Sequence, residues 1–190
     1  MQSQAVGSAA DVDLPLEQRK IIRKSAAAAL FCGIVLGGGY VLMPRFVTFP
    51  SDPVDRLAFA LQADVFILLW IAVGGQMVAR GRFRSKADNR GSAFGPPSPR
   101  IAIPVAFLQN SLEQAVMAVG AHLALATLLS GPALSLLACS VALFAVGRVT
   151  FLIGYPKGAG GRAFGMATTA LPTLCAYLLA IVLIVGRVVG

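Results

Sequence analysis

The stretch that decides the fold is LAFALQADVFILLWIAVGGQMVA, residues 57–79. At ~1.5 Å per helical residue this apolar segment is long enough to cross the ~30 Å hydrocarbon core of a bilayer. Its polar exceptions, Gln62 and Asp64, lie near its start. Arg80 and Arg82 follow directly, which is the basic flank typical of a membrane-spanning helix. The segment therefore predicts a transmembrane helix.

Four further segments have the same apolar character. They are residues 25–43, 101–129, 133–155 and 163–185. The chain as a whole is 57% hydrophobic and only 13% charged, whereas a soluble domain is about 25% charged. A soluble domain of this composition would leave too much apolar surface in water. We therefore predict an all-α integral membrane bundle with five spanning helices.

The chain before the first span is predicted to be a polar N-terminal tail, residues 1–24. It carries three acids and ends in the basic cluster RKIIRK. A cleaved signal peptide is the alternative reading of the span at residues 25–43. The long acidic leader argues against it, as does the lack of a clear small-residue cleavage site after the apolar run. We expect this segment to be a true transmembrane helix.

The basic residues outside the spans predict the orientation of the chain. Five spans place on one side Arg19, Lys20, Arg23, Lys24, Arg80, Arg82, Arg84, Lys86, Arg90, Arg100, Lys157 and Arg162, and on the other Arg45, Arg56 and Arg187. Cytoplasmic loops are enriched in Lys and Arg. The asymmetry predicts a cytoplasmic N-terminus and a non-cytoplasmic C-terminus.

The net charge of +8 suggests anionic partners. Because the basic residues cluster beside the apolar runs, we expect membrane lipid head groups to be those partners and expect no nucleic-acid binding. The cysteines, Cys32, Cys139 and Cys175, fall within apolar segments and are interpreted as small buried hydrophobes. His122 is interpreted as a packed helix histidine. We predict no metal site.

Three polar residues interrupt the third span. Asn110, Glu113 and Gln114 fall within one face about 100° wide, and an unpaired charge in the membrane costs ~2.5–3.5 kcal/mol or more. Arg148 in the fourth span is the natural counter-ion for Glu113. The alternatives are that the trio serves as interhelical hydrogen-bond glue and that Arg148 snorkels to the interface.

Two residues near the start of the last span form a candidate anion site. Tyr155 returns to nearly the same helical face as Arg148, although it also suits an interfacial belt. Arg162 follows a glycine-rich turn at a helix start, where the free N–H groups and the helix dipole add positive potential. An ordinary flanking arginine is the alternative for Arg162.

Two of these stretches resemble a known family. They are QNSLEQ, residues 109–114, and GRVTFLIGYPKGAGGR, residues 147–162. They are similar to the superfamily of membrane-associated proteins in eicosanoid and glutathione metabolism (MAPEG), which includes the microsomal glutathione transferases. The resemblance covers residues 57–187. It implies a four-helix core that assembles as a homotrimer and binds glutathione between neighbouring subunits near the cytosolic face, with residues 25–43 as an additional helix.

The resemblance also implies roles for single residues. The thiolate of glutathione would be stabilised by Arg162. The remaining ligand-binding positions would be Asn110, Glu113, Gln114, Arg148 and Tyr155. Departures from the family pattern are Ala106, where an arginine is usual, Gln114, where a tyrosine is frequent, and Phe151, where some members have a tyrosine.

The function that the resemblance implies is a membrane-bound transferase or peroxidase. It would use glutathione or a similar thiol as cosubstrate and act on a lipophilic electrophile. The alternative is a non-catalytic membrane assembly or regulatory protein that keeps the fold, which the departures permit. A small transporter is a third reading, and the lack of visible inverted repeats argues against it.

Overall fold

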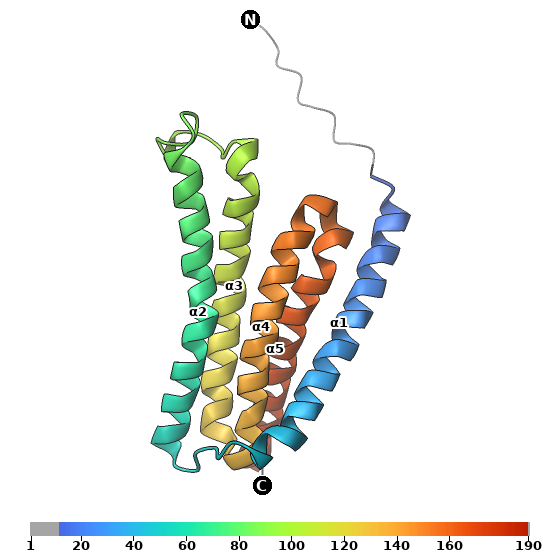
Figure 1. Ribbon diagram of the computed structural model, residues 1–190. Coiled ribbons are helices and arrows are strands. Elements are labelled where there is room, and N and C mark those ends of the chain that lie inside the picture. The colour runs from blue at the N-terminus through green and yellow to red at the C-terminus, as the bar shows by residue number, and fades with distance from the viewer. Residues whose placement is uncertain (1–11, 190) are drawn as a thin grey trace, which may run out of the picture.

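The computed structural model describes residues 12–189, which form an all-α bundle (Figure 1). Its long helices are α1 (Leu14–Leu42), α2 (Pro53–Phe83), α3 (Pro99–Leu128), α4 (Ser135–Gly154) and α5 (Gly158–Val189). Short 3-10 turns occur at Met43–Arg45, Ser92–Phe94, Gly131–Leu134 and Tyr155–Lys157. The described residues contain no strand. Residues 1–11, the start of the predicted polar tail, lie outside the described residues.

The first helix begins well before its apolar run. The carboxylate of Asp13 accepts a hydrogen bond from the backbone N–H of Leu16 at 3.0 Å, and Glu17 lies in the first turn. An acidic cap of this kind stabilises a helix start by satisfying free N–H groups. The second part of the predicted tail is therefore helical. Hydropathy marked where the membrane segment begins, whereas the cap decides where the helix begins.

The helices run up and down in neighbouring pairs. α2 packs along α3, α4 packs along α5, and α1 lies against α5 and α4 on the side away from α2. The connection after α1 passes beneath the bundle to reach α2 (Figure 1). The most apolar part of α3 has 44% of its residues buried, whereas the most apolar part of α1 has only 11% buried. The first helix is thus a peripheral addition to the four that follow it.

The helices are long and apolar enough to cross a membrane. Four helical stretches meet this description by length and composition, namely Leu14–Arg45, Pro53–Phe83, Pro99–Leu128 and Gly131–Val189. The last stretch contains both α4 and α5, which form an antiparallel hairpin (Figure 1). Many large apolar side chains face outward, including Phe66, Leu69 and Ile181. The protein is an integral multi-pass membrane protein, and the predicted fold class is confirmed.

The hairpin of α4 and α5 is closed by backbone contact between glycines. A Cβ atom at Gly147 would lie 3.0 Å from the carbonyl oxygen of Gly165, and one at Gly154 would overlap the backbone of Gly161. Small residues allow membrane helices to approach this closely. The approach brings the start of α5 beside the end of α4.

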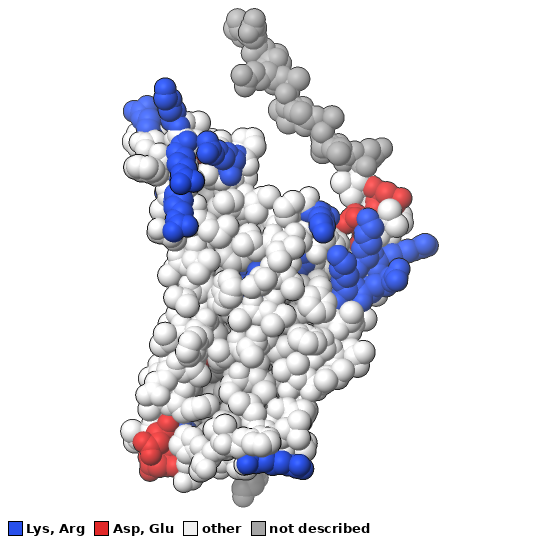
Figure 2. Space-filling view, in the orientation of Figure 1, with Lys and Arg blue, Asp and Glu red and all other residues white. Residues whose placement is uncertain are grey.

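Charged side chains gather at the two ends of the bundle. Figure 2 shows Lys and Arg over the α2–α3 connection and around the start of α1, with a smaller mixed group at the opposite end. The sides of the bundle between them are almost free of charge in this view. The twelve basic residues predicted to share a side belong to helix ends and connections at a single end of the bundle.

Candidate functional site

Arg148 of α4 lies at the centre of the polar cluster inside the bundle. Its side chain is completely buried. Nη1 donates to Oδ1 of Asn110 on α3 at 2.8 Å, and Nη2 donates to Oγ1 of Thr169 on α5 at 2.6 Å. The guanidinium also lies over the rings of Phe144 and Phe151, at 5.5 and 4.7 Å from their centroids. Arg148 therefore ties three helices together through its two terminal nitrogens, while its Nε is buried without a hydrogen-bond partner among the described residues.

A line of aromatic rings leads from Arg148 to the end of the bundle. Phe151 makes an edge contact with Tyr155, with ring centroids 5.4 Å apart. The guanidinium of Arg162 then lies 4.4 Å from the centroid of the Tyr155 ring. Such a cation–π contact stabilises the arginine without neutralising its charge. The predicted site residues Arg148, Tyr155 and Arg162 thus form one connected row.

Arg162 is half-buried beside an open cleft of about 250 Å³. Ile21 and Ser25 of α1 form one wall of the cleft, and Met166 of α5 lines it next to Arg162. Among the described residues, the carboxylates in ion pairs are those of Glu17, with Lys20, and Asp64, with His122. Arg162 has no acidic partner there. Its charge therefore remains available to an anion in the cleft.

The additional helix α1 reaches the start of α5 next to this cleft. Oε2 of Glu17 accepts a hydrogen bond from the backbone N–H of Gly160 at 2.8 Å. Nζ of Lys24 donates to the carbonyl of Gly161 at 3.4 Å. A carboxylate at a helix N-terminus is favoured by the helix dipole. Sequence reasoning did not predict these contacts, because they join segments far apart in the chain.

The predicted ion pair of Glu113 with Arg148 is wrong for the single chain. Glu113 lies on the exposed face of α3, where its Oε1 accepts from Nε2 of Gln109 at 3.2 Å. Asn110 instead is the partner of Arg148. Gln114 is buried, and its Oε1 has no partner among the described residues. The three polar residues of α3 therefore do not share one environment, because the boundary between the exposed and the buried face of α3 falls between Glu113 and Gln114.

His122 is buried in α3, as predicted, but it has a partner that sequence reasoning missed. Its Nδ1 lies 2.6 Å from Oδ1 of Asp64 on α2. The sequence signal for this pair was one polar residue in each of two apolar segments, Asp64 and His122. An acidic side chain inside the membrane requires a partner. Cys32 and Cys139 are also buried as predicted, whereas Cys175 is exposed on the bundle surface. Within the part of the chain described, no group of three metal-ligand residues occurs.

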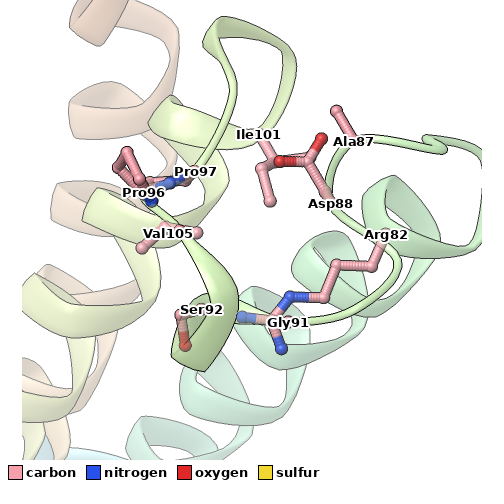
Figure 3. Close-up of a pocket in the computed structure, with 10 residues that line it drawn as sticks. Arg82, Ala87, Asp88, Gly91, Ser92, Pro96, Pro97, Ile101 and Val105 are labelled. Carbon is pink, nitrogen blue, oxygen red and sulfur yellow. The ribbon is translucent and has the colours of Figure 1, made fainter.

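The connection between α2 and α3 contains a small cavity of about 70 Å³ (Figure 3). Arg82 extends along it toward Gly91 and Ser92. Asp88 accepts hydrogen bonds from the Ser98 backbone N–H at 2.8 Å and from the Ser98 hydroxyl at 2.6 Å. A hydrogen bond from the Ser85 hydroxyl, together with these two from Ser98, lowers the pKa of the Asp88 carboxyl. Asp88 is thus an anchor of the connection.

The chain is similar to known membrane proteins. Transmembrane protein 79 of Mus musculus is 26% identical over 158 residues, which is 83% of this chain and 40% of that protein. The chain thus spans well under half the length of that relative. No solved structure matches the chain. The model of the MAPEG family matches residues 57–189, the region of α2 to α5 that holds the whole arginine and tyrosine row. The chain therefore belongs to the MAPEG family, whose name refers to membrane-associated proteins in eicosanoid and glutathione metabolism.

Proposed function

We propose that this protein is a membrane-bound transferase or peroxidase that activates the thiol of glutathione, or of a similar small thiol, for attack on a lipophilic electrophile. The observation that carries the proposal is Arg162, a half-buried cation without an acidic partner in the described chain, near a helix start and beside an open cleft. A nearby guanidinium favours the thiolate over the thiol. The thiolate is the nucleophilic form.

The other polar residues have supporting roles in this proposal. Tyr155 holds the Arg162 guanidinium over its ring, and Arg148 with Asn110 keeps α3, α4 and α5 in register below the cleft. Because Arg148 already donates to two protein oxygens, it positions the helices and does not bind the thiol. The lipophilic electrophile would enter from the membrane, since the helices around the cleft expose apolar surface.

A homotrimer is part of the proposal. Glu113 and Gln109 lie exposed near the middle of α3, among exposed apolar side chains such as Val116. A carboxylate facing lipid at this depth is costly. A neighbouring subunit packed on this face would remove Glu113 from lipid. It would also leave Glu113 free to contact a thiol ligand bound between subunits, which is where the family resemblance expects one.

The orientation follows from the twelve basic residues at one end of the bundle. With the positive-inside rule, this end is cytoplasmic and the C-terminus lies on the other side. With the three native cysteines replaced by alanine, a cysteine in place of Arg90 should then react with an impermeant thiol reagent from the cytoplasmic side, and one in place of Arg45 from the opposite side. Equal reaction of both from one side would refute the orientation.

The enzymatic proposal is tested with the purified full chain in nanodiscs. Glutathione and a chloronitrobenzene electrophile are added, and both thiolate absorbance and conjugate formation are measured. We expect Arg162→Ala to lower conjugation by about 100–1,000-fold, because loss of one group that stabilises a developing negative charge costs roughly that much. Lys157→Ala is the matched control, since Lys157 is an exposed cation in the 3-10 turn just before α5. Absence of glutathione binding at millimolar concentration would rule out glutathione as the thiol.

A second candidate function is a non-catalytic membrane assembly or regulatory protein. It is favoured by the burial of Arg148. Arg148 and Asn110 were expected to bind ligand, but they form a hydrogen bond to each other inside the bundle. In that case Arg162→Ala leaves the cellular phenotype intact, whereas Arg148→Ala destabilises the assembly. Comparing these two variants in cells separates the two functions.

A further inference from the structure

A buried carboxylate and imidazole form a second polar centre, away from the row of Arg162. Asp64 on α2 and His122 on α3 are each only 1% exposed, with Oδ1 and Nδ1 2.6 Å apart. The other carboxylate oxygen, Oδ2 of Asp64, is buried and has no partner among the described residues. His122 shares a cavity with Cys175 of α5. Cys175 lies ~20 Å along α5 from Arg162, at ~1.5 Å per residue.

The cost of a net charge inside the bilayer restricts which atoms of the Asp64–His122 pair carry protons. A net charge within the bilayer is expensive, so the pair is favoured in a form that is neutral overall. One neutral form has an Asp64 carboxylate and a doubly protonated His122. Another has a protonated Asp64 that donates to Nδ1, which leaves the ring proton on Nε2. A third neutral form, with the acid proton on Oδ2 and the ring proton on Nδ1, would bury an O–H donor without an acceptor, because Oδ2 has no partner among the described residues. In the two favoured forms Nε2 of His122 carries a proton and is a hydrogen-bond donor.

The cavity that His122 lines is otherwise almost apolar. Its volume is about 80 Å³, and the lining side chains apart from His122, Ser140 and Cys175 are leucine, alanine and proline. The hydroxyl of Ser140 already donates to the carbonyl of Leu136 at 2.8 Å. Since Cys175 is exposed, the cavity reaches the outer surface of the bundle. The polar atom that the His122 ring can offer to a molecule in this cavity is Nε2, because Nδ1 is taken by Asp64.

We propose that His122, held by Asp64, forms a second binding site that takes an uncharged lipophilic molecule through one acceptor oxygen, such as a ketone carbonyl. An acceptor is required because the site presents a donor. The molecule is uncharged because an anion beside the neutral pair would bring a net charge into the bilayer. The cavity holds the carbonyl and a few carbons, and the rest of the chain lies along the surface near Cys175.

The first test reads the proton on Nε2 directly. His122 is the only histidine of the chain, so ¹⁵N-histidine labelling of the full protein in nanodiscs gives one pair of ring signals. We expect a protonated Nε2 whose signal shifts when a medium-chain methyl ketone is added, and no shift with the alkane of the same length. An unprotonated Nε2, or equal shifts with ketone and alkane, would overturn the proposal.

The second test measures occupancy through Cys175. Maleimide labelling of Cys175 is followed while the ketone, the alkane and a carboxylate of the same length are titrated. The ketone should protect about fivefold better than the alkane, the factor expected of one net hydrogen bond. Stronger protection by the carboxylate would show that the site takes anions and would refute the uncharged class.

Variants separate this site from the proposed thiol chemistry. His122→Gln keeps a side-chain N–H donor and should keep the preference for the ketone, whereas His122→Leu should abolish it. Arg162→Ala is the control, and it should leave the preference unchanged, since no thiol takes part. The wild-type comparison needs no variant and stands even if His122→Leu does not fold. A ketone preference that survives in folded His122→Leu would assign the binding to other residues.

Discussion

Arg148 and Arg162 show how surroundings decide what an arginine does. Arg148 is fully buried and donates to Asn110 and Thr169, while Arg162 contacts the ring of Tyr155 beside a cleft. Complete burial and hydrogen bonds from both terminal nitrogens to neighbouring helices make Arg148 a structural tie, because its charged end is held inside the protein. Exposure beside a cleft leaves the charge available to a ligand. The two arginines therefore differ in function although both belong to the same row.

Arg148→Met tests the structural role. The substitution leaves Oδ1 of Asn110 and Oγ1 of Thr169 without their buried donor, and each such group costs about 1–3 kcal/mol. We expect a loss of about 2–4 kcal/mol in the free energy of unfolding, measured by denaturant titration in micelles. Arg162→Met is the control and should change the free energy by less than about 1 kcal/mol. Equal losses in both variants would contradict this division of roles.

Asp88 makes the α2–α3 connection sensitive to acid. Hydrogen bonds from Ser85 and Ser98 lower its pKa in the folded state. Its stabilising effect is thus complete above the unfolded pKa of about 3.9 and is lost as the pH falls through the lower folded value. Cleavage of the connection by an acid-tolerant protease should rise over this window. Asp88→Asn should be cleaved readily at neutral pH, and a variant as resistant as the wild type would remove Asp88 as the anchor.

At the scale of helices, glycine decides how α4 and α5 meet. The contacts of Gly147 with Gly165 and of Gly154 with Gly161 allow backbone to lie against backbone. This close approach places Thr169 of α5 within reach of the Arg148 guanidinium. α1 joins the same region through Glu17 at the start of α5. The polar row thus depends on the helix spacing as much as on its own side chains.

Gly165→Ala should separate the two helices. Its Cβ would overlap the backbone nitrogen of Phe151 and the carbonyl oxygen of Gly147, neither of which can rotate away. Overpacking of this kind costs about 1–3 kcal/mol, and we expect unfolding in micelles to show it. Gly75→Ala is the matched control, because nothing lies within 4 Å of its added Cβ. A stable Gly165→Ala protein would show that the hairpin tolerates a wider spacing.

At the scale of the whole molecule, the bundle has two polar centres at different depths and one uncovered polar face. The cavity beside His122 reaches Cys175, which lies ~20 Å along α5 from Arg162, so a molecule at one centre does not contact the other. The uncovered face is that of Glu113 on α3. A membrane protein leaves such a face bare only at a cost, which favours contact with another copy of the chain.

Glu113 provides the test of that assembly. We expect native mass spectrometry of the detergent-solubilised protein to give a trimer, and Glu113→Arg to shift it toward monomer, because a larger side chain of opposite charge would be buried without a matching partner in the neighbouring subunit. Arg90→Glu is the control, because it reverses a charge of the exposed α2–α3 connection. A monomeric wild-type protein would leave the exposed Glu113 without this explanation.

The sequence by itself determined the membrane bundle, the approximate span limits, the clustering of basic residues and the resemblance of residues 57–187 to the MAPEG family. These are local properties, because hydropathy, charge and motif spacing are read along one segment at a time. Only the tertiary structure decided that Arg148 pairs with Asn110 and not with Glu113, that Asp64 meets His122, and that α1 reaches the start of α5. Successive residues turn by about 100° around a helix, so a small rotation of each helix in the bundle exchanges one partner for another.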